Sequence, residues 1–370
     1  MTLLQSKKFP LRYEKPENNL IGEGTMRSRF RRLAAMAAVA TISITSLAAC
    51  SSQSAGGEEP LVGLIIKTQD NPFYVKMAEG AKAEAAEQGF TLQSATGEGQ
   101  SDVDSQIKSI ENFIARGAKA ILVTPAGDGI IPALKKARDA GIMVIALDSP
   151  LGDPTAADGT FATDNVQAGV LVGEWAKEAL GDTAPRIATL DLSTDQIPVD
   201  VQRNQGFLQG FGIDVADDGK MWDEKDPRLV GHEVTDANEA GGRQGMEKLL
   251  QKDPTINLVY TINEPTAAGA YQAITAAGKQ DQITVVSVDG GCPGVKNVQG
   301  GVIDATSMQF PLKMAEQAVQ AVSAWLEDGT TPENSPGLDF TNTGVTLITD
   351  QAQAGVESED VDWGLESCWG

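Results

Sequence analysis

From residue 61 onward, short apolar runs alternate with longer stretches in which apolar residues recur at helical spacing. This alternation is typical of βαβ units built on a parallel sheet. In the first half of the chain, glycines at positions 89, 117 and 141 end the expected helices. We expect strands at 61–66, 90–95, 120–123 and 142–147, and helices at 73–88, 102–116 and 130–140. The first half therefore predicts a doubly wound α/β module.

The same alternation of short apolar runs and longer helical stretches resumes after Phe161-Ala162. Here we expect helices at 166–180, 201–211, 239–251 and 266–277, and strands at 186–190, 229–234, 258–262 and 284–288. Two such modules in tandem imply a cleft between them, because ligands of open parallel sheets bind beyond the carboxyl ends of the strands. The predicted fold class is α/β, with two doubly wound parallel-sheet lobes and candidate site residues just after the strands.

The composition excludes several classes of function. The chain has 370 residues, 41% of them hydrophobic, which is more than one ordinary domain needs. Lys plus Arg number 29 against 51 for Asp plus Glu, and the resulting charge of −22 repels phosphate backbones, so nucleic acid is not expected as a partner. A single histidine, His232, and three cysteines cannot supply a His-based zinc site. We expect neither a metal nor a cofactor.

An export signal precedes the α/β region. Residues 27–32 carry four arginines, and residues 33–49 carry no charge and lead to Leu47-Ala48-Ala49-Cys50. This arrangement predicts a signal peptide rather than a membrane span. Because small residues precede Cys50, whose thiolate can take a lipid, the segment resembles a bacterial lipoprotein signal. The alternative is an ordinary secretory signal with an incidental cysteine.

The N-terminal region divides into three expected parts. Residues 1–25 are polar and unpatterned, so we interpret them as an upstream extension and Met26 as the true start. Residues 26–49 are the signal peptide, and residues 50–60 are a flexible Ser/Gly-rich tether. The Arg31-Arg32 pair leaves twin-arginine export open beside the general secretory route.

If the protein is exported, we expect its two remaining cysteines to pair, because thiols outside the cytoplasm normally become disulfides. Cys292 and Cys368 are then the only available pair. Their bridge would fasten the end of the chain to the body and stabilise the fold by about 4–5 kcal/mol. The alternative is two free, buried thiols.

Polar and aromatic residues gather where the expected strands end. The candidates are Lys67, Asn71, Phe73, Tyr74, Thr124, Asp128, Asp148, Asp164, Asn165, Asp191, Asn238, Asn263, Glu264 and Asp289, with Arg203 on the helix after Asp191. Carboxylates and amides suit a ligand rich in hydroxyl groups, and aromatic rings suit the C–H faces of a sugar. Any single Asp or Asn could equally be a turn or helix cap, and either aromatic residue could belong to the core. Asp148, Arg203, Asn263 and Asp289 are harder to explain structurally, because such groups at the mouth of a buried sheet need partners.

Six motifs at these strand ends carry a resemblance to a known family. They are Asn71-Pro72-Phe73-Tyr74, Leu147-Asp148, Arg203 within 201–207, Asn263-Glu264-Pro265, Val288-Asp289-Gly290 and Met308-Gln309-Phe310-Pro311. In order and spacing across residues 61–349 they resemble the ribose-type (type I) periplasmic sugar-binding proteins of ABC transporters. Residues 249–257, 287–297, 355–358 and 368–370 are more similar still to the fructose-binding members of that family.

The resemblance implies two lobes joined by three crossover strands near residues 162–165, 307–310 and 336–340. The N-terminal lobe would comprise residues 61–163 plus 310–338, and the C-terminal lobe residues 164–309 plus 339–370. By match to the family motifs, the residues that contact sugar would be Asn71, Phe73, Asp148, Arg203, Asn263, Asp289 and Gln309.

Other positions bear on the choice of sugar. Lys67 is similar to a ligand lysine of the arabinose-binding relative, and Asn238 stands in the loop where ribose binders place an aromatic residue. Ser149, Val288 and Thr124 stand where ribose binders carry arginine, phenylalanine and asparagine. These departures argue against ribose.

Together, the leader and the resemblance predict an exported, monomeric lipoprotein that is not an enzyme. It would capture a monosaccharide, fructose first, and deliver it to an ABC permease from the outer face of the membrane or the periplasm. Two rivals are an exported enzyme with Asp148 and Asp289 as acid and base, and a receptor that feeds a membrane sensor. A sugar-sensing repressor would need a DNA-binding motif before Leu61, where the leader stands instead.

Overall fold

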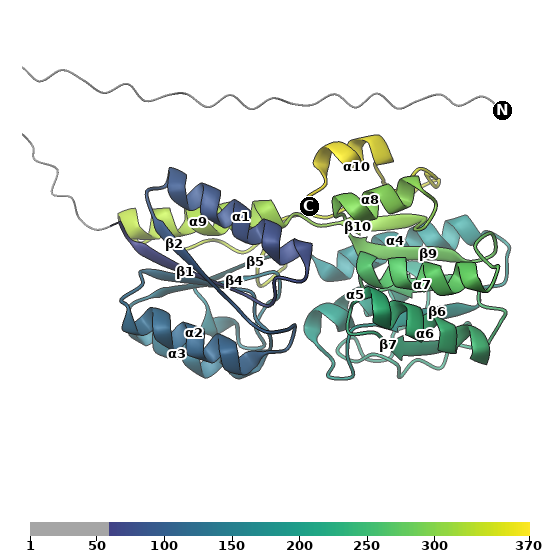
Figure 1. Ribbon diagram of the computed structural model, residues 1–370, viewed down its shortest axis with the longest axis horizontal. Coiled ribbons are helices and arrows are strands. Elements are labelled where there is room, and N and C mark those ends of the chain that lie inside the picture. Colours follow the sequence, from purple (N-terminus) through teal and green to yellow (C-terminus); the bar gives the residue numbers. More distant parts are fainter. Residues whose placement is uncertain (1–58) are drawn as a thin grey trace, which may run out of the picture. The chain divides into compact units, whose positions relative to one another are not determined.

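The computed structural model describes residues 59–370, which form two α/β lobes, each with a six-stranded sheet between layers of helices (Figure 1). The predicted upstream extension, the leader with Cys50 and most of the tether lie outside the described residues. Within 59–370, none of the helices combines the length and apolar content that a membrane crossing requires. The same residues hold no group of three or more His, Cys, Asp or Glu side chains suited to a metal ion.

The first lobe is built on a parallel sheet with the strand order β11-β5-β4-β3-β1-β2. Helices α1 and α9 cover one face and α2 and α3 the other (Figure 1). The strands are β1 (Leu61–Ile66), β2 (Thr91–Thr96), β3 (Ala120–Val123), β4 (Met143–Leu147), β5 (Gly159–Ala162) and β11 (Thr341–Asn342). The helices are α1 (Pro72–Glu87), α2 (Val103–Ala115), α3 (Ile131–Asp139) and α9 (Pro311–Asp328), with short 3-10 turns at Asp128–Ile130 and Pro154–Ala156.

Strand β1 shows why its residues form the centre of this sheet. Val62, Leu64 and Ile66 point into the core beneath α1 and α9, whereas Ile65 points into the core over α2 and α3. Alternate residues of a strand face opposite sides, so a continuous apolar run is what a strand buried on both faces requires.

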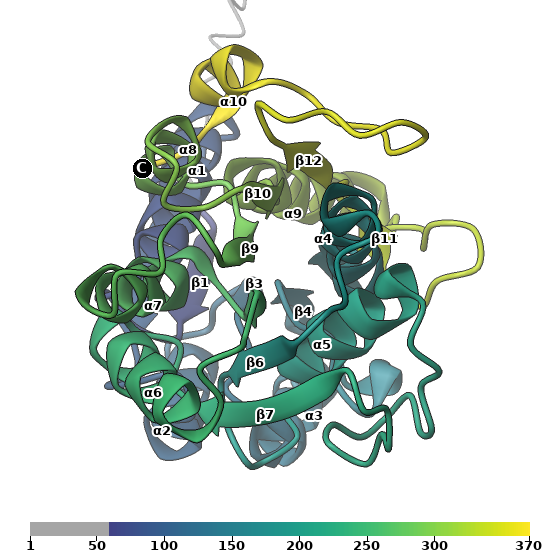
Figure 2. The ribbon, with the colours of Figure 1, turned by 90° about the vertical axis from the view of Figure 1, so that its right-hand side faces the viewer.

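The second lobe repeats this plan, except that one edge strand of its sheet is antiparallel. Its strands are β6 (Ile187–Asp191), β7 (Leu229–Val234), β8 (Leu258–Thr261), β9 (Thr284–Asp289), β10 (Ala305–Met308) and β12 (Thr346–Ile348), in the order β12-β10-β9-β8-β6-β7. Its helices are α4 (Asn165–Leu180), α5 (Pro198–Phe211), α6 (Glu239–Lys252), α7 (Glu264–Ala276), α8 (Cys292–Gln299) and α10 (Val361–Ser367). Figure 2 shows α4 and α5 on one side of the sheet and α6, α7 and α8 on the other.

The two strand orders correspond position by position, so β4 of the first lobe matches β9 of the second. Each lobe has the doubly wound order 2-1-3-4-5, extended by one edge strand. The predicted fold class is confirmed, and most expected strands and helices differ from the observed ones by a few residues or less. Helices α8, α9 and α10 were not among the elements expected from the apolar pattern.

Three segments cross between the lobes. The first follows β5, which ends at Ala162, and the second lies between β10 and α9, close to the predicted positions. The third was expected within 336–340. Instead, Thr341 and Asn342 still pair with β5 in the first sheet, so the chain crosses between Asn342 and Thr346. The short β11 adds an edge strand that the expected lobe boundary at 338 omits.

The C-terminus is tied to the second lobe. The predicted disulfide between Cys292 and Cys368 is present, with the two Cα atoms 4.9 Å apart. It joins the start of α8 to the residue that follows α10, so the last residues of the chain lie against the body of the protein.

Candidate functional site

A pocket of about 440 Å³ lies between the two lobes, at the carboxyl ends of both sheets. It is the kind of cleft that a pair of doubly wound modules predicts. The first lobe lines it with Lys67, Asn71, Phe73, Tyr74, Gln100 and Asp148, and the second lobe with Leu192, Val199, Arg203, Ala237, Ile262, Asn263 and Asp289; Gln309 comes from the second crossover. Nine of the ten ligand residues expected from the sequence therefore share one pocket.

The N-terminus of α1 carries three of these residues. Asn71 caps the helix, since its Oδ1 accepts a hydrogen bond from the Phe73 backbone N–H at 2.9 Å. Pro72 follows at the first helical position, where its fixed φ suits a helix start. The cap therefore places Phe73 and Tyr74 in the first turn, with their rings edge to face at 5.2 Å. Asn71 is both a cap and a pocket residue.

Asp148 faces the pocket from the end of β4. Its backbone has a φ of 70°, a left-handed conformation that is uncommon for a non-glycine residue and often found at functional sites. Lys67 Nζ lies 3.4 Å from Asp148 Oδ2, and both side chains are almost fully buried. The pair neutralises two charges that would otherwise be costly to bury.

Arg203 reaches the pocket because α4 and α5 pack unusually closely. A Cβ atom on Gly169 of α4 would lie 2.2 Å from the Arg203 carbonyl oxygen, so only glycine fits there. This approach brings Asn165, the first residue of α4, within reach, and Arg203 Nε donates to Asn165 Oδ1 at 2.8 Å. Arg203 Nη1 donates to the Ile262 carbonyl at 3.1 Å. The guanidinium is thus fixed from two sides.

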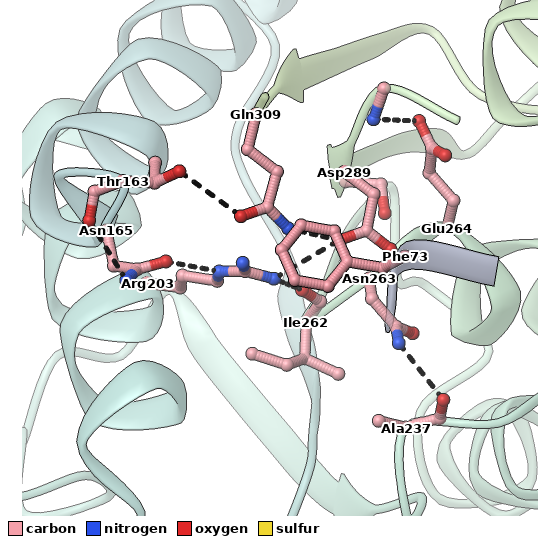
Figure 3. Close-up of polar contacts among 12 residues, drawn as sticks. Phe73, Thr163, Asn165, Arg203, Ala237, Ile262, Asn263, Glu264, Asp289 and Gln309 are labelled. Carbon is pink, nitrogen blue, oxygen red and sulfur yellow. Dashed lines mark hydrogen bonds and ion pairs between the residues drawn. The ribbon is translucent and has the colours of Figure 1, made fainter. Parts of the chain in front are cut away.

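Asp289 is the matching aspartate at the end of β9, and its φ of 152° is also positive. Its Oδ1 lies 3.5 Å from Arg203 Nη1 and accepts a hydrogen bond from Gln309 Nε2 at 2.9 Å. Gln309 Oε1 in turn accepts from Thr163 Oγ1 at 3.2 Å. Figure 3 shows this chain of contacts, which links two crossover segments to the acidic and basic groups of the pocket.

Burial changes the pKa values of two carboxyl groups on the second-lobe side of the pocket. It raises the pKa of Asp289 to about 6, although the Arg203 guanidinium and the Gln309 amide oppose the rise. Glu264 lies behind Asp289 and accepts hydrogen bonds from the backbone N–H groups of Gly290 and Gly291. Burial and the nearby Asp289 raise the pKa of Glu264 to about 8. The two carboxyl groups therefore compete for ionisation near neutral pH.

Asn263 is in the pocket, but Asn238 is not. Asn263 caps α7 by accepting from the Thr266 N–H at 3.1 Å, and its Nδ2 donates to the Ala237 carbonyl at 3.0 Å. Asn238 is exposed and caps α6, where its Oδ1 accepts from the Gly241 N–H. Asn238 therefore lies outside the pocket lining, and Ala237 lines the pocket in its place.

Most of the other strand-end candidates have structural roles. Thr124 is fully buried and lies 3.4 Å from the Ile65 carbonyl, and Asp128 accepts from the Gly152 N–H. Asp164 caps α4, and Asp191 accepts from the side chains of Thr189, Asn204 and Trp222. Asp164 therefore matches the cap interpretation, whereas Thr124, Asp128 and Asp191 make contacts inside their own lobes that are neither helix caps nor local turns.

Five further residues line the pocket without having been predicted from the sequence: Gln100, Leu192, Val199, Ala237 and Ile262. Gln100 accepts from the Tyr74 hydroxyl at 3.2 Å and lies in the loop after β2. The strand-end rule selects polar residues, so it would have found Gln100 after β2 but not the apolar Leu192 and Ile262 after β6 and β8. Val199 and Ala237 offered no chemical signal, because apolar residues of this kind are common throughout the chain.

Contacts within the protein use only part of the hydrogen-bonding capacity of the pocket. They engage Oδ1 of Asn71, Oδ2 of Asp148, Nε and Nη1 of Arg203, and Oδ1 of Asp289. Among residues 59–370, Asn71 Nδ2 and Arg203 Nη2 donate to no other protein group, and the Asp148 and Asp289 carboxylates, which each offer about four acceptor positions, retain free lone pairs. A small molecule with both donors and acceptors, such as one bearing hydroxyl groups, can pair with all four.

Fold and site together define a two-lobed solute-binding protein. Residues 62–330 match a family model described as a periplasmic binding protein domain. The chain belongs to this family of periplasmic binding proteins, whose related members are solute-binding proteins and not enzymes.

Individual relatives are similar over most of their length. The chain is 29% identical to the D-apiose import binding protein of Actinobacillus succinogenes, covering 80% of this chain and 91% of that protein. It is 28% identical to the ribose import binding protein RbsB of Salmonella typhimurium, covering 77% and 91%. A solved structure of the arabinose-transporter binding protein of Shewanella sp. ANA-3, bound to L-arabinofuranose, has a TM-score of 0.66 at 26% identity, covering 78% and 91%.

Proposed function

We propose that this protein captures a monosaccharide between its two lobes and delivers it unchanged to an ABC import permease. The observation that carries the proposal is the pocket itself, where unpaired donors and acceptors from both lobes face one small space beside the Phe73 ring. Relatives named for D-apiose and ribose import support a sugar as the ligand. Charge-assisted hydrogen bonds of this kind contribute about 1.5–3 kcal/mol each.

We propose fructose as the sugar to test first. The support is the similarity of residues 249–257, 287–297 and 368–370 to fructose-binding members of the family, together with the residues that replace those of ribose binders. Fructose can also close to a five-membered ring, and relatives at 26–27% identity are described with galactofuranose and L-arabinofuranose. A furanose ring would present hydroxyl groups on both edges, one for each lobe.

The mechanism we propose is a shift between open and closed arrangements of the lobes. A sugar that touches Asp148 on one lobe and Asp289 on the other binds more tightly when both are close, so it favours closure by that difference in affinity. The permease would then receive the closed form. No covalent step is required.

Calorimetric titration of residues 51–370 with a monosaccharide panel tests the proposal. We expect fructose to bind more tightly than ribose, allose and glucose, with the sugar recovered unaltered. If another monosaccharide binds more tightly, that sugar becomes the proposed ligand in place of fructose, and the proposal that the ligand is a monosaccharide stands. Binding of none of them, or conversion of the sugar to a product, would contradict the proposal.

We further propose that the exported protein acts as a monomer held to the membrane by a lipid on Cys50. The support is the Leu47-Ala48-Ala49-Cys50 sequence after an uncharged leader. In bacteria that express the full chain, we expect the wild-type protein in the membrane fraction with the mass of a diacylated form, and Cys50→Ala in the soluble exported fraction. An identical distribution of both proteins would show that Cys50 is not the anchor.

A further inference from the structure

The next-to-last residue of the chain, Trp369, lies where both lobes and a crossover segment meet. Its ring is 6% exposed and belongs to the apolar core of the first lobe. There it contacts Phe73 edge to face, with ring centroids 5.4 Å apart. Its Nε1 donates to the Gln309 backbone carbonyl at 2.8 Å. Phe73 and Gln309 both line the sugar pocket, so Trp369 supports two of its walls from behind.

The main chain of Trp369 belongs to the other lobe. The Cys292 N–H donates to the Trp369 carbonyl at 2.8 Å, and Gly291 and Trp369 form a parallel β-bridge. The preceding residue, Cys368, is bonded covalently to Cys292 at the start of α8. The backbone is therefore anchored to the second lobe, while the ring is packed into the first.

We propose that Trp369 is a positioning residue of the sugar site and that the Cys292–Cys368 disulfide holds it in place. The ring fixes the Phe73 face, and the indole N–H fixes the main chain of Gln309, whose side chain binds Asp289. The inference rests on the proposed sugar-binding function, which it deepens. No sugar contact by Trp369 itself is involved.

The same contacts link Trp369 to closure of the lobes. If the lobes part, a ring anchored to the second lobe must leave the apolar core of the first, and exposing buried apolar area to water is unfavourable. Trp369 therefore favours the closed arrangement in which the pocket is complete. Because affinity for sugar depends on the population of that arrangement, loss of the ring lowers affinity without removing any contact to the sugar.

A merely structural role for Trp369 makes a different prediction. Trp363 is a suitable control, because it lies in the same C-terminal segment and packs against apolar residues of the second lobe alone. Trp363→Ala removes the same side chain from a partly buried position, so both variants lower the melting temperature. Only the Trp369 variants should disturb Phe73 and Gln309.

The experiment combines sugar titration with hydrogen exchange measured by mass spectrometry on the free protein. Trp369→Ala is expected to lower affinity at least tenfold and to speed amide exchange in both the 71–76 and the 309–312 segments. Trp369→Phe, which keeps a ring but loses the N–H, is expected to fall between wild type and Trp369→Ala. The pair Cys292→Ser and Cys368→Ser is expected to resemble Trp369→Ala, whereas Trp363→Ala keeps wild-type affinity and exchange.

Two results would overturn the inference. One is a Trp369→Ala variant that binds sugar with wild-type affinity, whatever its rate of amide exchange. The other is a pair of variants, Trp369→Ala and Trp363→Ala, with equal sugar affinity and equal amide exchange. Wild-type behaviour of the double cysteine variant would overturn the anchoring role of the disulfide. If the wild-type protein binds no sugar in the panel, the proposed function fails, and the exchange of the two segments then decides the inference alone.

Discussion

Replacing Arg203 with methionine is expected to lower sugar affinity at least about a hundredfold, which corresponds to about 2.7 kcal/mol. The side chain is 5% exposed and holds three groups at once: the Asn165 amide, the Ile262 carbonyl and the Asp289 carboxylate. Methionine fills a similar volume but donates no hydrogen bond, so the sugar loses the donor at Nη2 and Asp289 loses its charged partner. Calorimetry on the variant and the wild type measures the effect.

Loss of fold must be separated from loss of the ligand group, because an unpaired buried carboxylate is strongly destabilising. The double variant Arg203→Met with Asp289→Leu removes that unpaired charge. We expect it to recover part of the melting temperature but none of the affinity. Arg228→Met, which breaks a pair with Asp226 far from the pocket lining, serves as the matched control. Affinity of Arg203→Met within threefold of wild type would contradict its place in the site.

The second large effect is expected at Asp289, where substitution by alanine should lower affinity at least about tenfold, or about 1.4 kcal/mol. The carboxylate is the acceptor that the second lobe offers to the sugar. Since its pKa in the folded protein is about 6, it is mostly ionised at pH 7.5 and mostly protonated at pH 5. Protonation removes acceptor strength and the attraction to Arg203, so wild-type affinity should fall as pH drops through about 6.

Asp289→Asn tests the predicted loss of affinity on substitution separately from the predicted loss of affinity at low pH. It keeps the shape but cannot titrate, so its affinity should be low at pH 7.5 and should change little between pH 7.5 and 5. Asp304→Asn is the control, because Asp304 is a half-buried carboxylate on the same sheet that accepts from the Val285 N–H and does not line the pocket. A steep loss of affinity at low pH that persists in Asp289→Asn would assign the titration to another group.

The repeated apolar runs were sufficient to predict the lobes. A strand such as β4, with all five residues buried, leaves little alternative to a sheet covered on both faces. The edges were harder to predict. Thr341 and Asn342 form a two-residue strand with no apolar run of their own, and only pairing with β5 makes them part of the first sheet. Long-range pairing of this kind leaves no local pattern in the sequence.

The site could be predicted wherever a side chain follows directly from the end of a strand. Asp148 and Asp289 are examples, since β4 and β9 occupy equivalent places in the two sheets. Asn238 shows the limit of the rule. Asp236 and Ala237 both adopt positive φ, at 53° and 51°, and this turn presents Ala237 to the pocket and Asn238 to α6. Neither residue is a glycine, so the sequence held no signal for the turn.

Whether a helix-capping residue also faces the pocket could be decided only from the structure. Asn71 and Asn263 use one end of the side chain to cap a helix, and both also line the pocket. The two roles are compatible because an amide has separate donor and acceptor ends. A rule that treats them as alternatives will therefore undervalue such residues. The part played by Trp369 could not have been predicted at all, since it depends on where a disulfide places the end of the chain.

The central claim is that a monosaccharide bridges the lobes, and a crystal structure of residues 51–370 grown with fructose tests it most directly. We expect one intact sugar in the pocket, hydrogen-bonded to Asn71 or Asp148 on one side and to Arg203 and Asp289 on the other. A sugar bound to only one lobe, or bound elsewhere while this pocket holds solvent, would contradict the account.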